Sequence, residues 1–218
     1  MSQYRLHCFC QSGNAYKVAL YLNCAGLEWE PVFVDFMNGA TRDQNWRGTT
    51  NIMGEVPVLE ADGRRLSQSG IILTHLAETT GKFAPKNEDE RLEAWRWILF
   101  DNHKFTSFFA AHRFMRSFTP TPTDPAALAM LRGRAEAAYK VVEEHLSARR
   151  HYMLGAEPTI VDFSLAGYVY YPQDETGFDI ARDFPAIDAW RNRIKALPGW
   201  ADPYDLMPGE RVAPRAQD

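Results

Sequence analysis

The chain has 218 residues, of which 45% are hydrophobic and 24% charged, and its formal net charge at pH 7 is −4. This length and composition are typical of a water-soluble protein with one large domain or two small ones. Residues 1–83 carry 7 Lys and Arg against 8 Asp and Glu, and the remainder is also slightly acidic. The charge therefore argues against a protein that binds nucleic acid or an anionic membrane surface through bulk charge.

Targeting, disulfide and metal signals are absent from the sequence. No apolar run approaches the ~20 residues that a membrane-spanning helix needs, and the N-terminus shows no leader-peptide pattern. We therefore expect a cytoplasmic protein with no membrane partner. Cys8, Cys10 and Cys24 form no CxxC pair and are odd in number, which excludes a disulfide framework. The six histidines are scattered, so we expect no metal ion.

The first eighty residues alternate strand patterns with helix patterns. Apolar side chains at every second position predict strands, those three and four apart predict helices, and Asp-Gly predicts a hairpin turn. The predicted elements are a strand over 4–10, a helix over 15–25, a strand over 29–36, a loop with one short helix over 37–51, strands over 56–60 and 64–66, and a helix over 69–80. Gly26 and Gly81 are typical helix-ending residues, and Ser69 is a typical N-cap.

The remainder of the chain is almost entirely helical by the same criterion. The predicted helices cover 88–110, 125–146, 160–171 and 185–197. Asn87, Asp124 and Thr159 are typical N-cap residues for three of them. A polar stretch with one proline separates the two regions of the chain. We therefore expect two domains, 1–82 and 89–205, with a linker over 83–88 and a polar tail over 206–218.

Pro57 interrupts the hydrophobic run before the hairpin. Proline cannot donate to a sheet ladder, so within a strand it usually marks an edge. The alternative is a cis peptide bond between Val56 and Pro57 at the start of the strand. A cis bond would turn the backbone N–H and C=O of Val56 away from the sheet, where they can pair with an extended, peptide-like ligand. The local sequence favours the edge proline and leaves the cis bond open.

Two predicted helix starts carry polar side chains that can serve a ligand. Gln68 and Ser69 stand where the free N–H groups and the positive dipole end of a helix favour a carboxylate; a simple N-cap at Ser69 explains the same pattern. Ser12-Gly13-Asn14 opens the first helix. A hydroxyl there can donate a hydrogen bond to a bound thiolate and lower the pKa of that thiol, or Ser12 and Asn14 can simply cap the helix.

The order and spacing of these features resemble the glutathione S-transferase family. The resemblance covers residues 3 to about 200 and rests on four segments: SGNAYKVAL from Ser12, GEVPVLEADG from Gly54, LSQSGIILTHLAE from Leu66 and LGAEPTIVDFSLAGY from Leu154. It implies an α/β N-terminal thioredoxin-like domain of order β-α-β-α-β-β-α, followed by an all-α C-terminal helical-bundle domain. The last segment resembles the family's internal helix-capping segment, whose role lies in folding.

The resemblance also implies roles at the sulfur of glutathione. Ser12 matches the residue that hydrogen-bonds the sulfur in bacterial, serine-type members with a zeta- or theta-like motif. Asn14 stands where zeta-like and bacterial beta-class motifs carry cysteine, which argues against thiol-transfer chemistry and makes Asn14 a second candidate for activating the sulfur. Val56, before the family's cis-proline at Pro57, matches the residue whose backbone pairs with the cysteinyl part of glutathione.

Further matches concern the two ends of glutathione. Gln68 and Ser69 match the pair that binds the γ-glutamyl carboxylate, while Glu55 stands where relatives often carry Arg, Gln or Lys. Asp101 falls where many relatives place an acidic residue that reaches the γ-glutamyl amine of a partner subunit; a solvated or capping carboxylate is the alternative. The candidates for the glycyl end are Gln44, Trp46 and Arg47.

The resemblance implies a cytoplasmic, homodimeric detoxification transferase. It would activate the glutathione thiolate for attack on a small hydrophobic electrophile, with glutathione as co-substrate and no metal. The alternatives are a zeta-like glutathione-dependent cis–trans isomerase, a dehalogenase or lyase, and a non-catalytic glutathione-binding relative. The electrophile would lie in an interdomain cleft along the long helix. Its candidate lining residues are Phe105, Phe108, Phe109, His112, Arg113 and Phe114, although an aromatic run at helical spacing is more often core.

Overall fold

The structure is a computed structural model that describes residues 3–215. Its contacts divide the chain into two compact units, one of Met1–Ala84 with Leu197–Arg211 and one of Pro85–Ala196 with Val212–Asp218. The sequence predicts instead that 197–205 belongs to the helical domain and that the tail starts at 206. The difference arises because the segment 197–211 makes its contacts with residues of the first unit.

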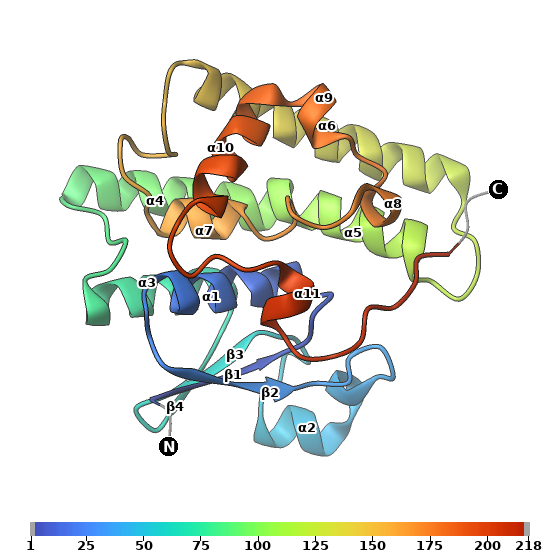
Figure 1. Cartoon of the computed structure of the whole chain (residues 1–218). Coiled ribbons are helices and arrows are strands. Elements are labelled where there is room, and N and C mark those ends of the chain that lie inside the picture. The colour runs from blue at the N-terminus through green and yellow to red at the C-terminus, as the bar shows by residue number, and fades with distance from the viewer. Residues whose placement is uncertain (1–2, 216–218) are drawn as a thin grey trace. The chain divides into compact units, whose positions relative to one another are not determined.

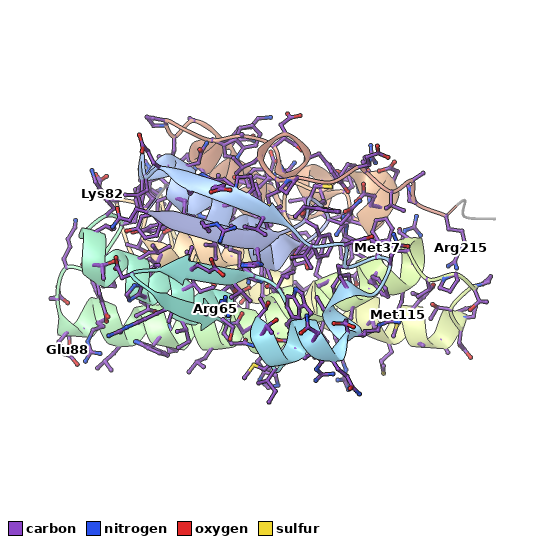
Figure 2. All side chains as sticks on the ribbon, turned by 90° about the horizontal axis from the view of Figure 1, so that it is seen from below. Met37, Arg65, Lys82, Glu88, Met115 and Arg215 are labelled. Atoms are coloured by element: carbon purple, nitrogen blue, oxygen red, sulfur yellow. The ribbon has the colours of Figure 1, made fainter. Side chains whose placement is uncertain are left out.

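A four-stranded mixed sheet of order β2-β1-β3-β4 forms the centre of the first unit. β1 (Tyr4–Cys8) pairs in parallel with β2 (Trp29–Phe33) and antiparallel with β3 (Val58–Ala61), which pairs antiparallel with β4 (Arg64–Ser67). Arg65 on β4, labelled in Figure 2, donates from Nε to Glu60 Oε1 at 3.0 Å and thereby links the two strands of the hairpin.

The helices of this unit lie on both sides of the sheet (Figure 1), as expected for a thioredoxin-like domain. α1 (Gly13–Cys24) and α3 (Ser69–Thr80) cover one face, and α2 (Gln44–Thr49) lies on the other; a 3₁₀ turn, η1 (Ala40–Arg42), precedes α2. α1 and α3 bury apolar side chains against the sheet, and Gly81 ends α3 with φ +70°. The predicted order β-α-β-α-β-β-α is confirmed.

Three strand ends differ from the sequence prediction by two or three residues. β1 stops at Cys8, and the N–H of Cys10 donates to the carbonyl of Pro208 (2.9 Å) instead of to a strand. β2 stops at Phe33, and the chain turns at Val34, whose carbonyl accepts from the N–H of Phe36. β3 starts only at Val58, because the preceding proline has no N–H with which to extend the ladder.

The C-terminal segment 197–211 completes the first unit. It contains α11 (Pro203–Leu206). The hydroxyl of Tyr16 on α1 donates to the carbonyl of Ala201 (2.8 Å), and Asn23 Nδ2 donates to the carbonyl of Gly199 (2.5 Å). Gln11 Nε2 donates to the carbonyl of Glu210 (2.7 Å). Buried or half-buried polar groups of α1 and of the turn before it therefore depend on residues more than 170 positions away in the sequence.

The second unit is all-helical, as predicted. Its elements are α4 (Glu88–Phe100), a π-helical turn η2 (Asp101–Phe105), α5 (Thr106–Ser117), α6 (Pro125–Ser147), α7 (Ile160–Leu165), α8 (Gln173–Thr176), α9 (Ile180–Asp183) and α10 (Pro185–Lys195). α4, η2 and α5 form one continuous rod, and α6 runs beside α5 (Figure 1). The helix predicted over 160–171 is shorter and ends at Leu165. Arg215, labelled in Figure 2, donates its backbone N–H to Ser117 (2.9 Å).

Two features organise the core of this unit. Phe105 and Phe109 stack on Tyr139 of α6, with ring centroids 4.2 and 5.0 Å apart. Asp162 forms a capping box with the predicted N-cap Thr159 and also accepts hydrogen bonds from Met153 N (2.9 Å) and Trp190 Nε1 (2.8 Å). One buried carboxylate therefore joins the start of α7 to the preceding loop and to α10. No helix within residues 3–215 has the length and apolar character to cross a membrane.

Candidate functional site

The topology brings the polar motifs to one edge of the sheet. In the antiparallel ladder His7 pairs with Val58, so the end of β1 lies beside the start of β3. Val58 also pairs with Ser67, so the end of β4 lies beside the same point. α1 starts a few residues after the end of β1, and α3 starts just after the end of β4. The Val56–Pro57 bond lies just before the start of β3. The two helix starts and this bond are therefore grouped at this edge.

Ser12 is the N-cap of α1, with an extended backbone (φ −85°, ψ 100°) and 6% of its surface exposed. Its Oγ accepts a hydrogen bond from the N–H of Ala15 at 3.2 Å. Within residues 3–215 the hydroxyl proton has no acceptor. Capping and ligand binding are therefore compatible, because the oxygen caps the helix while the O–H remains able to donate.

Asn14 lies in the first turn of the same helix and is half-buried. Its Oδ1 is enclosed and accepts no hydrogen bond from the described part of the chain. An enclosed amide oxygen without a donor costs free energy. A ligand that supplies a donor, or an amide that turns its NH₂ toward a ligand acceptor, would remove that cost. Asn14 is therefore suited to contact a ligand.

The Val56–Pro57 peptide bond is cis. The sheet ladder of β3 begins at Val58, so the backbone N–H and C=O of Val56 lie outside it. Pro57 itself is buried. The edge proline that the local sequence favours is thus wrong, and the cis alternative is confirmed. The structure leaves a short stretch of backbone before β3 that can pair with an extended ligand.

The start of α3 differs from the prediction by one residue. Gln68 is the N-cap, with φ +69° and no capping hydrogen bond from its side chain, and Ser69 is the first helical residue. Ser69 is 5% exposed, and its hydroxyl makes no hydrogen bond within residues 3–215. The first intrahelical bond runs from the N–H of Ile72 to the carbonyl of Gln68. The N–H groups of the first turn and the Ser69 hydroxyl are therefore free to hold an anion.

Glu55 is exposed and lies against this helix start, because Gln68 Nε2 donates to Glu55 Oε2 at 2.9 Å. The loop that carries Glu55 is fixed by Asn51, a residue for which the sequence predicts no role. Asn51 is 8% exposed; its Nδ2 donates to the carbonyl of Glu55 (2.9 Å), and its Oδ1 accepts from Met53 N (3.1 Å). The Asn-x-x-Gly spacing of Asn51 and Gly54 was the available signal for this turn.

The three residues predicted for a glycyl end all lie on α2. Gln44 is exposed in the first turn of α2. Trp46 is half-buried, and its backbone N–H donates to the carboxylate of the N-cap Asp43 (2.8 Å). Arg47 donates from Nε to the carbonyl of Ile52 at 3.1 Å. Arg47 therefore holds the loop before β3, while Gln44 remains open to solvent.

The structure does not support a ligand role for Asp101. Its side chain is fully buried within the helical unit. Oδ1 accepts from the hydroxyl of Thr106 (2.6 Å), and Oδ2 accepts from the hydroxyl of Ser164 (2.7 Å). The Asp101–Thr106 spacing of five residues coincides with the π-helical turn. Asp101 stabilises that turn and, because it is fully buried, is neither accessible to a ligand nor solvated.

Most of the predicted electrophile-contacting residues are core residues. Phe105 and Phe109 are 1% and 0% exposed and pack on Tyr139. Arg113 forms a buried ion pair with Glu175, with Nη2–Oε2 at 2.5 Å, and is therefore not available to an anionic substrate. His112 is also buried, while Phe108 is half-buried and Phe114 is 40% exposed.

The cysteines are poor nucleophiles. Burial raises the pKa of the Cys8 thiol to about 12, with a smaller contribution from Cys10, and burial raises the pKa of Cys24 to about 12 as well. Cys10 is completely buried. Since the thiolate is the reactive form, a thiol reaction at this site requires a thiol from the ligand. Within the described residues no cluster of His, Cys, Asp and Glu is suited to hold a metal ion.

The chain combines a thioredoxin-like domain, which has a cis-proline before its third strand, with an all-helical unit. This combination defines a class of two-domain proteins, and comparison with known proteins places the chain in that class. Residues 2–78 match the profile of the glutathione S-transferase N-terminal domain, and residues 125–193 match that of the C-terminal domain. The crystal structure of a glutathione S-transferase from Pseudomonas fluorescens Pf-5 shares 32% sequence identity, covers 93% of this chain and 99% of its own, and gives a TM-score of 0.84. The chain belongs to the glutathione S-transferase family.

Two relatives with comparable sequence identity are named for other reactions. Maleylacetoacetate isomerase of Rhizobium meliloti is 29% identical over 171 residues, which are 76% of this chain and 79% of the isomerase. The disulfide-bond oxidoreductase YfcG of Escherichia coli is 26% identical over 202 residues, 87% of this chain and 89% of the relative. The family is thus clear, while its members differ in reaction.

Proposed function

We propose that this protein is a glutathione transferase that activates the glutathione thiolate at Ser12 for attack on a small hydrophobic electrophile. The observation that carries the proposal is the geometry of Ser12, which caps α1 through its oxygen and keeps its hydroxyl proton for a ligand. A hydrogen bond to a bound sulfur stabilises the thiolate and lowers the pKa of the thiol.

The other residues of the site hold the peptide in place. The backbone N–H and C=O of Val56 pair with the cysteinyl part of glutathione, strand to strand. The free N–H groups at the start of α3 and the Ser69 hydroxyl receive the γ-glutamyl carboxylate. Gln44, Trp46 and Arg47 remain the candidates for the glycyl end. Asn14 is the second group that can reach the sulfur.

The reaction requires no group on the chain to react covalently. The sulfur lone pair forms a bond to the electrophilic carbon, and the leaving group departs with its bonding electrons or, for an addition, the electrons move onto the neighbouring atom, which then takes a proton from water. The chain contributes a stabilised nucleophile and a fixed orientation. We assign the protein to the serine-type, zeta- or theta-like group, in the cytoplasm, with a role in detoxification.

A second function, glutathione-dependent cis–trans isomerisation, is favoured by the 29% identity to a maleylacetoacetate isomerase. In that reaction the thiolate adds to a double bond and leaves again, so the same Ser12 hydroxyl would serve. A dehalogenase or lyase would use the same thiolate, and a binding protein without turnover would use the same peptide contacts. The product distinguishes these functions, because isomerisation returns glutathione unchanged and conjugation consumes it.

A homodimer is part of the proposal. α4 and α6 of the helical unit leave Leu92, Leu99, Met130 and Val141 between 44% and 60% exposed. A second copy that covers these side chains would remove apolar surface from water. Sedimentation velocity of the wild-type chain measures the assembly directly, and a monomer at micromolar concentration would contradict this part of the proposal.

Retention on immobilised glutathione, followed by a panel of aromatic halides, isothiocyanates, peroxides and maleyl acids, tests the activity. We expect retention and conjugation of at least one electrophile. Turnover of the maleyl acid alone would support the isomerase. Retention with no turnover of any compound would support a binding protein, and failure to bind glutathione at millimolar concentration would refute the proposal as a whole.

A further inference from the structure

Among the residues that the structure describes, the carboxylate of Glu55 has no cationic partner. Within residues 3–215 it forms no ion pair, and its side-chain partner is the neutral amide of Gln68, which donates from Nε2 at 2.9 Å. Gln68 is the N-cap of α3, and the next residue, Ser69, is 5% exposed and its hydroxyl makes no hydrogen bond in the described part of the chain. A negative charge thus stands beside the place where the proposed function puts a ligand carboxylate.

The position of Glu55 is fixed by its loop. Asn51 holds the carbonyl of Glu55 with one side-chain atom and the N–H of Met53 with the other. Gly54 has φ +69°, and a Cβ there would lie 2.9 Å from the carbonyl oxygen of Thr41. The loop is therefore closely packed on its inner side, and the carboxylate is held at the helix start.

From this arrangement we infer that Glu55 is the counter-ion for the α-ammonium group of the γ-glutamyl end of the ligand, an inference that rests on the proposed function. A ligand carboxylate alone would meet the like charge of Glu55. An α-amino acid carries its ammonium and carboxylate groups on the same carbon, so one can face Glu55 while the other faces the N–H groups of α3. Glu55 and α3 together select a zwitterionic amino-acid head.

The competing explanation is that Glu55 only orients Gln68. Glu55→Gln separates the two, because a glutamine side-chain oxygen still accepts the hydrogen bond from Gln68 while the charge is removed. Glu78→Gln is the matched control. Glu78 is an exposed carboxylate on α3, the helix that Gln68 caps. It lies ten residues after that N-cap and therefore about 15 Å away along the helix axis.

The experiment measures by calorimetry the affinity of wild type and both variants for S-methylglutathione and for its deaminated form, S-methyl-glutaryl-cysteinylglycine. We expect the wild type and Glu78→Gln to prefer the amino ligand by at least tenfold at low salt, the size of one partly screened charge pair. In Glu55→Gln this preference falls to within about twofold, and the deaminated ligand binds more tightly than it binds to wild type because a like charge has been removed.

An unchanged preference in Glu55→Gln, with the amino ligand still bound, would refute the ammonium role and leave the proposed function intact. A preference that falls equally in both variants would also refute it, because the effect would then come from net charge. If the wild type bound neither ligand at millimolar concentration, the proposed function would fail first and the role of Glu55 with it.

Discussion

At the scale of single residues, Ser12 is the side chain on which the proposed chemistry depends. Ser12→Ala removes the N-cap hydroxyl of α1, and we expect kcat for conjugation to fall about 100-fold, the usual loss for one donor to a developing anion. The KM for glutathione should change by less than about threefold. Ultraviolet absorbance of the bound thiolate against pH should show a raised thiol pKa in the variant.

Ser69→Ala is the control for that experiment. Under the proposed function its hydroxyl receives the γ-glutamyl carboxylate, so the KM should rise while the pKa of the bound thiol stays unchanged. A Ser12→Ala enzyme with wild-type kcat would show that another group, with Asn14 the first candidate, activates the sulfur.

His112 predicts an acid sensitivity of the helical unit. Burial, reinforced by the nearby Arg132 and Arg116, lowers the pKa of its imidazole to about 4. The unfolded chain binds a proton near the ordinary pKa of ~6.5, while the folded chain does not. The free energy of unfolding is therefore unaffected above that pH and falls as the pH drops from about 6.5 toward 4.

His112→Gln should reduce this acid loss. Between pH 7 and pH 4.5 we expect the variant to lose about 2 kcal/mol less stability than wild type, measured by urea unfolding at both pH values. Equal losses in the two proteins would show that His112 does not titrate on unfolding in this range.

At the scale of elements, most helix caps were predictable and several strand ends were not. Asn87, Asp124 and Thr159 cap α4, α6 and α7 as predicted, because capping is a contact between residues two or three apart. The end of β1 depends on a carbonyl of Pro208, almost 200 residues away. Local patterns carry no information about such a partner.

The residues of the candidate site likewise fall into those that local patterns predict and those that depend on distant partners. Residues defined by a helix start, such as Ser12 and the Gln68–Ser69 pair, were found from the sequence to within one residue. Asp101 and Arg113 were misplaced because helical spacing does not determine which face of a helix is buried, and their partners Ser164 and Glu175 lie more than sixty residues away. The hydrogen bond between Gln68 and Glu55 could not be predicted from the sequence, because only the β3–β4 hairpin brings the two residues together.

Gly133 offers a stabilising change within an element. It is exposed inside α6, has an ordinary helical backbone, and a Cβ built there would contact nothing within 4 Å. Gly133→Ala should raise the free energy of unfolding by roughly 0.5–1 kcal/mol, because alanine loses less backbone entropy in a helix. Urea unfolding measures the change, and a destabilised variant would show that this face of α6 is covered in solution.

Asp162 offers the opposite test. Its two oxygens accept from the backbone of Met153 and Thr159, from the Thr159 hydroxyl and from the indole of Trp190. Asn has a single acceptor oxygen, so Asp162→Asn leaves buried N–H groups facing an NH₂ group. We expect a loss of about 3 kcal/mol in the urea-unfolding free energy. A loss below about 1 kcal/mol would mean that the loop at Met153 rearranges.

At the scale of the whole molecule, Gly199 lies where the C-terminal segment 197–211 packs against α1 within the first unit. It has φ +80°, and a Cβ there would lie 2.5 Å from the carbonyl oxygen of Asn23 on α1. Gly199→Ala should therefore cost at least about 3 kcal/mol, the sum of left-handed backbone strain and overpacking. Gly26→Ala, at φ +65° with nothing within 4 Å, should cost only about 1 kcal/mol. Similar losses in thermal unfolding would show that the C-terminal segment detaches easily.

The return of residues 197–211 to the first unit has a consequence for biosynthesis. Residues 3–84 leave the ribosome before residues 197–211, which carry the acceptors for the Cys10 amide and the Tyr16 hydroxyl. These polar groups of the first unit must wait through the synthesis of the whole helical unit before they are satisfied. A ribosome that stalls before Gly199 therefore releases an unfinished first unit for chaperones or proteases.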